Sequence, residues 1–93
     1  MPKVRISNQL FKEITKVFDV TTSTKILEKI KSLEQAPHVG KTLSNVGGIV
    51  IKELKFQKYR FYYITDGVVL KFGSEDELAS LIIKFVRMSD KKN

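Results

Sequence analysis

The chain of 93 residues contains no cysteine, which excludes disulfide bonds, cysteine-ligated zinc and thiol catalysis together. It also lacks long apolar runs, since none approaches the roughly 18 residues of a membrane-spanning helix. The first residues, MPKVRISNQLFKEI, lack the apolar segment of a signal peptide. These absences predict a soluble cytoplasmic protein without a membrane segment.

Acidic residues are scarce, with 10 Asp and Glu against 17 Lys and Arg, so the net charge is +7. This balance favours a polyanionic partner, either a nucleic acid or an acidic protein segment. The alternative is that the charge serves solubility alone. Hydrophobic residues make up 42% of the chain and there are no internal repeats, so we expect one globular domain over residues 1–93.

The stretch from Ile49 to Phe72 is rich in β-branched and aromatic residues and carries Asp66-Gly67 between two alternating runs. This dipeptide favours a two-residue turn, so the two runs should pair antiparallel. The register then predicts a core face with these opposed pairs: Thr65 with Val68, Tyr63 with Leu70, and Phe61 with Phe72. The other face, called the open face below, carries Arg60, Tyr62, Ile64, Val69 and Lys71.

A further strand over 49–56 precedes this hairpin, although the bend at Gln57-Lys58 has no Gly, Asn or Asp to supply a positive φ. A tight turn would pair Leu54 with Phe61 in the core, and Lys55 with Arg60 and Glu53 with Tyr62 on the open face. The same register directs Lys52 inward near Tyr63. Because a buried unpaired ammonium is costly, we expect a bulge, a longer loop or a half-covered strand there.

Two amphipathic helices are predicted before the sheet. The first, capped by Ser7 or Asn8 and ending near Phe18, has the apolar stripe Leu10, Phe11, Ile14, Val17 and Phe18. The second, capped by Thr22 or Ser23 and ended by Pro37, has the stripe Ile26, Leu27, Ile30 and Leu33. Their short connection predicts an antiparallel helical hairpin packed on the core face. Residues 4–7 fit a short strand, and residues 38–48 fit a loop.

The segment 74–88 permits two interpretations. Ser74 and Glu77 form a capping-box pattern, and helical spacing relates Leu78, Leu81, Ile82, Phe85 and Val86, which favours a helix over 75–88. Residues 80–88 are also rich in β-branched and aromatic types, which favours a strand. Periodicity and composition do not decide between the two.

Four short motifs stand in order along the chain: PHVGKTL (37–43), IKELKF (51–56), YRFYY (59–63) and KFVRMSDKK (84–92). With the helical hairpin before them, they resemble the RelE/ParE superfamily of toxins from toxin–antitoxin modules, including its HigB-like branch. The resemblance implies an α+β fold, with an N-terminal αα-hairpin packed on a small antiparallel β-sheet. It also implies that residues 80–88 are the last strand, after a helical turn at 75–79. The segment GSEDELAS (73–80) departs from the shorter connection usual in that family.

RelE-like and HigB-like members cleave messenger RNA at the ribosome and are held inactive by an antitoxin, whereas ParE members inhibit DNA gyrase. The resemblance therefore implies a ribosome-dependent messenger RNA endonuclease without a metal or cofactor, with an acidic antitoxin as its protein partner. Two alternatives remain open: a ParE-like gyrase inhibitor and a non-catalytic RNA-binding domain.

Metal-independent RNA cleavage needs a base, an acid, and cations that stabilise the charged transition state. The resemblance implies a catalytic set of Arg60, Arg87, Lys52 and Lys55, beside an RNA-binding set of Lys84, Tyr62 and Lys71. Arg60 is expected to grip the scissile phosphate, with a cross-strand ion pair to Glu53 as the alternative. The single histidine, His38, lies in the predicted loop, so no catalytic role is expected for it. The tail SDKKN also lacks the aromatic or histidine residue that some members use there.

Overall fold

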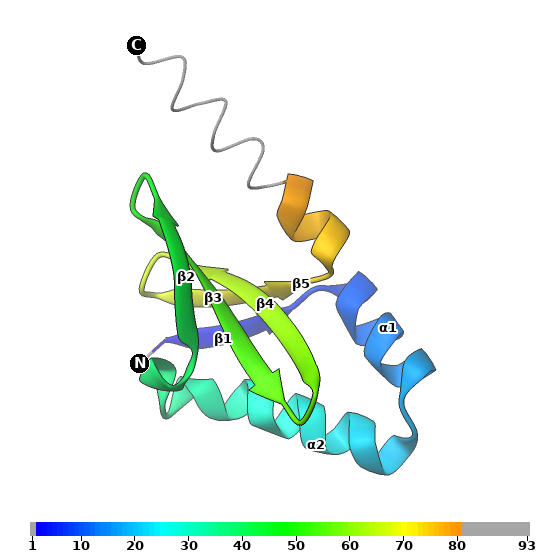
Figure 1. The fold of residues 1–93 in the computed structure, drawn as a ribbon. Helices are drawn as coiled ribbons and strands as arrows, with labels where there is room; N and C mark the ends of the chain where they lie inside the picture. Colours follow the sequence, from blue (N-terminus) through cyan, green and yellow to red (C-terminus); the bar gives the residue numbers. More distant parts are fainter. Residues whose placement is uncertain (1, 81–93) are drawn as a thin grey trace.

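The computed structural model describes residues 2–80, whose strands form one five-stranded sheet in the order β1-β5-β4-β3-β2 (Figure 1). The strands are β1 (Lys3–Ile6), β2 (Lys41–Val46), β3 (Ile49–Phe56), β4 (Tyr59–Thr65) and β5 (Val69–Gly73). The α+β class is confirmed, but the prediction of a purely antiparallel sheet is wrong. β1 pairs parallel to β5, and the intervening helices and strands provide the long crossover that a parallel pair requires.

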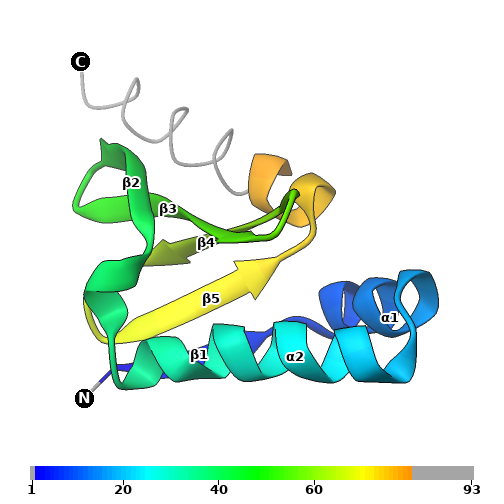
Figure 2. The same ribbon diagram turned by 60° about the horizontal axis from the view of Figure 1, so that its bottom comes forward.

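Helices α1 (Asn8–Val17) and α2 (Val20–Lys31) lie on one side of the sheet, with α2 running beneath it in Figure 2. Two 3-10 turns, η1 (Ser32–Glu34) and η2 (Pro37–Val39), lead from α2 to β2. The core forms between these helices and the predicted core face. It contains Leu10, Ile14, Ile26, Ile30, Leu33, Leu54, Phe61, Tyr63, Leu70 and Phe72.

The helix starts follow the rule that a short polar side chain caps the free N–H groups. Ser7 caps α1 as predicted, since its Oγ accepts a hydrogen bond from the Leu10 N–H at 3.1 Å. The predicted cap of α2 is wrong. Asp19 holds that position, and its carboxylate accepts the Thr22 N–H at 2.7 Å, which lowers the pKa of the Asp19 carboxyl.

The apolar stripe of α1 is only partly buried. Leu10 and Ile14 reach the core, whereas 46% of Phe11 and 71% of Val17 remain exposed. Phe18 is half-buried and meets the Tyr59 ring edge-on, with the ring centroids 4.7 Å apart. The predicted burial of Phe11 and Val17 is therefore wrong, because α1 covers less of the sheet than its apolar period suggests.

The β4–β5 hairpin has the predicted faces but a different register, with Tyr63 opposite Phe72 and Thr65 opposite Leu70. The turn is wider than two residues because Asp66 Oδ1 accepts hydrogen bonds from the N–H groups of Val68 and Val69, at 2.9 and 3.1 Å. These two bonds lower the pKa of the Asp66 carboxyl. Since the register moves by an even number of residues, the strand residues keep their predicted faces. The predicted burial of Val68 is wrong, because it lies in the turn and is 65% exposed.

The β3–β4 hairpin has the predicted register, with Leu54 opposite Phe61 and Lys55 opposite Arg60. Its tight turn forms although Gln57 must adopt a positive φ of 55°. Lys52 faces inward as predicted and is half-buried, and its ammonium donates to the Pro37 carbonyl at 3.2 Å. This bond partly offsets the cost of withdrawing the charge from water.

The predicted loop over 38–48 is wrong, because its second half is strand β2, paired antiparallel with β3. Val46 lies opposite Ile49 across a turn of Gly47 and Gly48, both of which have a positive φ. A Gly-Gly pair between two strands is typical of a hairpin. The loop was predicted because the segment is rich in Gly, Ser and Asn, which are also typical of loops. The register shifts between Thr42 and Ser44, so a bulge lies opposite Lys52 and Ile51.

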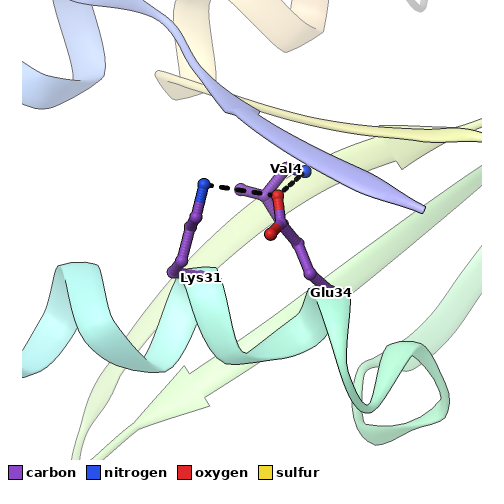
Figure 3. Close-up of polar contacts among 3 residues, drawn as sticks. All are labelled: Val4, Lys31 and Glu34. Carbon is purple, nitrogen blue, oxygen red and sulfur yellow. Dashed lines mark hydrogen bonds and ion pairs between the residues drawn. The ribbon is translucent and has the colours of Figure 1, made fainter. Parts of the chain in front are cut away.

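The outer edge of β1 is covered by a carboxylate from η1 (Figure 3). Glu34 Oε2 accepts the outward Val4 N–H at 2.8 Å and also lies 3.4 Å from the Lys31 ammonium. The Val4 hydrogen bond is the main cause of the lowered pKa of the Glu34 carboxyl. A charged side chain at this position discourages another strand from pairing with β1.

A last helix begins at residue 75 and is described to residue 80. The predicted capping box is confirmed, since the Ser74 N–H donates to Glu77 Oε1 at 2.9 Å and the Glu77 N–H donates to Ser74 Oγ at 3.2 Å. Ser80 is helical, where the strand was predicted to begin, and residues 81–88 of that prediction lie outside the described part.

Candidate nucleic-acid interface

The open face of the sheet presents cations from every strand. The strand registers place Lys3, Arg5, Lys41, Lys55, Arg60 and Lys71 on this face, and all six are exposed. Within the five described strands, Glu53 is the one carboxylate on the same face. The open face is therefore strongly electropositive, while α1 and α2 lie on the opposite side (Figure 2).

Arg60 is held in an ion pair with Glu53, whose Oε1 lies 3.1 Å from the Arg60 Nη1. About half of the Arg60 side chain (49%) is exposed, against 12% for Glu53. The predicted cross-strand ion pair is therefore present. The Arg60 end of the pair is exposed, but the Glu53 carboxylate is largely covered, so a phosphate on Arg60 must offset the cost of leaving that carboxylate without its Arg60 partner.

A second group of cations lies at the β1–β5 end of the face. Arg5 and Lys71 are directly opposite each other on the parallel strands, and Lys3 lies opposite Val69. Lys71 was a predicted RNA-binding residue, but Lys3, Arg5 and Lys41 were missed. These three residues lie on the open face because β1 pairs with β5 and β2 pairs with β3, and neither pairing was predicted.

Between the cations lies an apolar strip formed by Ile49, Ile51, Ile64 and Val69. Ile64 is only 6% exposed, so this position is not open as the sequence suggested. A cavity of about 170 Å³ lies over part of the strip, lined by Ile49, Ile64 and Val69 together with Thr65, Asp66 and Lys71. Tyr62, half-buried, lies at the other end between Glu53 and Gly73.

The structure thus brings together four predicted site residues, Arg60, Lys55, Tyr62 and Lys71. It separates Lys52 from them, because that side chain points to the core face and donates to Pro37. Lys84 and Arg87 lie outside the described residues. His38 lies in η2, outside the strands of the sheet.

The described cations can bind phosphate groups, and the Tyr62 ring can stack on a base. In residues 2–80, no cluster of three or more His, Cys, Asp or Glu side chains could hold a metal ion. The helices within this range lack the length and apolar character needed to cross a membrane. Comparison with protein-family models, with curated proteins and with solved structures found no match to this chain.

Proposed function

We propose that the open face binds RNA. The observation that carries this proposal is the set of six exposed Lys and Arg side chains on one sheet face, where Glu53 is the one carboxylate within the strands of residues 2–80. Lys and Arg neutralise phosphates and release counterions, which supplies most of the affinity of sequence-independent binding. Tyr62 adds a surface on which an unpaired base stacks.

The finer proposal is that the chain is a ribosome-dependent messenger RNA endonuclease toxin, neutralised by an acidic antitoxin. Its support is the motif resemblance together with the position of Arg60, whose guanidinium can exchange Glu53 for a phosphate in bidentate geometry. Lys55 lies opposite Arg60 and adds a second charge. Arg87 and Lys84 belong to the same proposal through the resemblance.

Growth arrest on induced expression tests the toxin proposal, with primer extension on a reporter message. The wild type is compared with Arg60→Ala and with Lys29→Ala, which removes an exposed cation from α2. We expect arrest and in-frame cleavage that Arg60→Ala abolishes and Lys29→Ala retains. Arrest with intact messages would contradict the endonuclease and favour gyrase inhibition.

A second candidate is RNA binding without cleavage. It is favoured by the position of Lys52, a proposed catalytic cation that is bonded to the Pro37 carbonyl on the core side. In this case the open face retains its salt-sensitive affinity for RNA, and induced expression causes neither cleavage nor arrest.

A further inference from the structure

A groove between α1 and β4 lies beside the open face. It consists of two cavities of about 310 and 180 Å³, both lined by Leu10, Glu13, Arg60 and Phe61. The shared lining makes them neighbouring parts of one depression, which we call the α1–β4 groove. It is the place where α1 fails to cover the sheet completely.

One end of the α1–β4 groove is apolar. Ile14, Val17, Phe18 and Tyr59 line the smaller cavity together with the shared residues. Val17 belongs to the apolar period of α1 yet is 71% exposed, so part of the stripe has no partner within the described chain. An apolar surface left open beside a concave site is typical of a protein interaction site.

The other end is acidic. Glu75 and Asp76 line the larger cavity together with Glu13 and Arg60, which also line the smaller one. The three carboxylates are exposed. No ion pair joins any of them to another residue within the part of the chain that the structure describes. The protein has a net charge of +7, so these carboxylates form a locally negative region on a positively charged protein.

We propose that the α1–β4 groove binds a segment of a partner protein in which apolar side chains are followed by Lys or Arg. The apolar side chains fill the end lined by Ile14 and Phe18, and the cations meet the carboxylates at the other end. Charge complementarity selects this occupant over an acidic one, which the rest of the surface would attract. The groove lies beside the open face and shares Arg60 and Tyr62 with it.

Because both cavities are lined by Arg60, a segment in the groove lies against the residue proposed to grip phosphate. Occupation of the groove should then reduce RNA binding at this end of the open face. This consequence rests on the proposed function, whereas binding in the groove does not.

The probe is a synthetic peptide in which a run of leucines is followed by a run of lysines, and its counterpart has glutamates in place of the lysines. We expect the lysine peptide to bind and to shift the amide resonances of Leu10, Glu13 and Ile14. The triple variant Glu13→Gln, Glu75→Gln, Asp76→Asn should bind the lysine peptide about tenfold more weakly, because it loses several exposed charge contacts, each worth up to about 1 kcal/mol. The matched control Glu28→Gln removes an exposed carboxylate from α2 and should leave the affinity unchanged.

Three results would overturn the proposal: tighter binding of the glutamate peptide in the groove, equal losses in the triple variant and the control, or peptide shifts confined to other surfaces. The oligomeric state of the free protein is measured in parallel by sedimentation. If the protein self-associates through the groove, the occupant of the groove is a second copy of the chain and not a different partner. Circular dichroism of each variant verifies that it folds. RNA affinity is measured separately, so failure of the RNA proposal leaves the peptide result interpretable.

Discussion

At the scale of single residues, the tightest constraint is the contact between Tyr63 and Gly40. Tyr63 is fully buried and stacks on Phe72, with the ring centroids 4.4 Å apart, and its hydroxyl has no hydrogen-bond partner among the described residues. Burial raises the pKa of this hydroxyl. A Cβ at Gly40 would overlap the Tyr63 hydroxyl oxygen and lie 2.8 Å from its Cζ, so only glycine fits there.

Tyr63→Phe should therefore raise the free energy of unfolding by about 1 kcal/mol, because it removes a buried hydroxyl that lacks a partner. Gly40→Ala should lower it by about 1–3 kcal/mol through overpacking. The double variant should recover part of that loss, since the clashing oxygen is gone. Urea unfolding of the four proteins measures these changes, and a destabilised Tyr63→Phe would show that the hydroxyl has a partner.

The turn residue Gln57 provides a second test, because it is the one non-glycine residue with a positive φ in residues 2–80. Left-handed backbone costs a residue with a Cβ about 1–2 kcal/mol, so Gln57→Gly should stabilise the protein despite the added chain entropy of glycine. We expect a net gain of about 0.5–1 kcal/mol in urea unfolding. Lys58→Gly is the matched control and should give no gain, because Lys58 needs no positive φ.

At the scale of elements, Glu77 joins the two ends of the described chain. Its Oε1 accepts hydrogen bonds from the Ser7 hydroxyl at 2.6 Å and from the Ser74 N–H at 2.9 Å. Ser7 in turn caps α1, so one carboxylate connects two helix starts. The Ser7 hydrogen bond is the largest cause of the lowered pKa of the Glu77 carboxyl.

Glu77→Ala should destabilise the protein by about 1–2 kcal/mol, since it removes a capping box and leaves the Ser7 hydroxyl without its acceptor. Glu75→Ala, at an exposed position of the same turn, should cost much less. Hydrogen exchange of the amides at the start of α1 and at residues 75–78 should report the loss locally. Equal effects of the two substitutions would contradict the bridging role.

The sequence predicted the faces of β3, β4 and β5, because alternation of apolar residues is local information. It did not predict the β4–β5 register, which depends on the hydrogen bonds that the Asp66 carboxylate accepts from the Val68 and Val69 N–H groups. It also did not predict β2, because the segment around the Gly47-Gly48 turn has the composition of a loop. The parallel pairing of β1 with β5 joins segments far apart in the chain. The same limit applies to the candidate site. Alternation along the strands predicted that Arg60, Lys55, Tyr62 and Lys71 share the open face, whereas Arg5 lies there only because β1 pairs with β5.

At the scale of the whole molecule, four carboxyls within residues 2–80 have a lowered pKa: Asp19, Glu34, Asp66 and Glu77. Their stabilisation is present above the ordinary carboxyl pKa and is lost as the pH falls through the folded values. The free energy of unfolding should therefore decrease from pH 7 towards pH 3, as measured by urea titration.

Glu34→Gln isolates one contribution, because it keeps an acceptor for the Val4 N–H and removes the titrating group. Its stability should depend less on pH than that of the wild type over the same range. An unchanged slope would mean that the contact in Figure 3 does not contribute to the acid sensitivity.

The measurement that tests the central claim most directly is RNA affinity as a function of salt. A single-stranded RNA is titrated with the wild type and with two triple variants. The sheet variant combines Arg5→Gln, Lys55→Gln and Lys71→Gln. The helix variant combines Lys12→Gln, Lys25→Gln and Lys29→Gln. The two triple variants have equal net charge, but the second set lies on α1 and α2. If the open face binds RNA, the first variant should bind more weakly, and the slope of its log affinity against log salt concentration should become shallower by about 2. The second variant should stay near the wild type in both quantities. Equal losses in both, or a larger loss in the helix variant, would contradict the account.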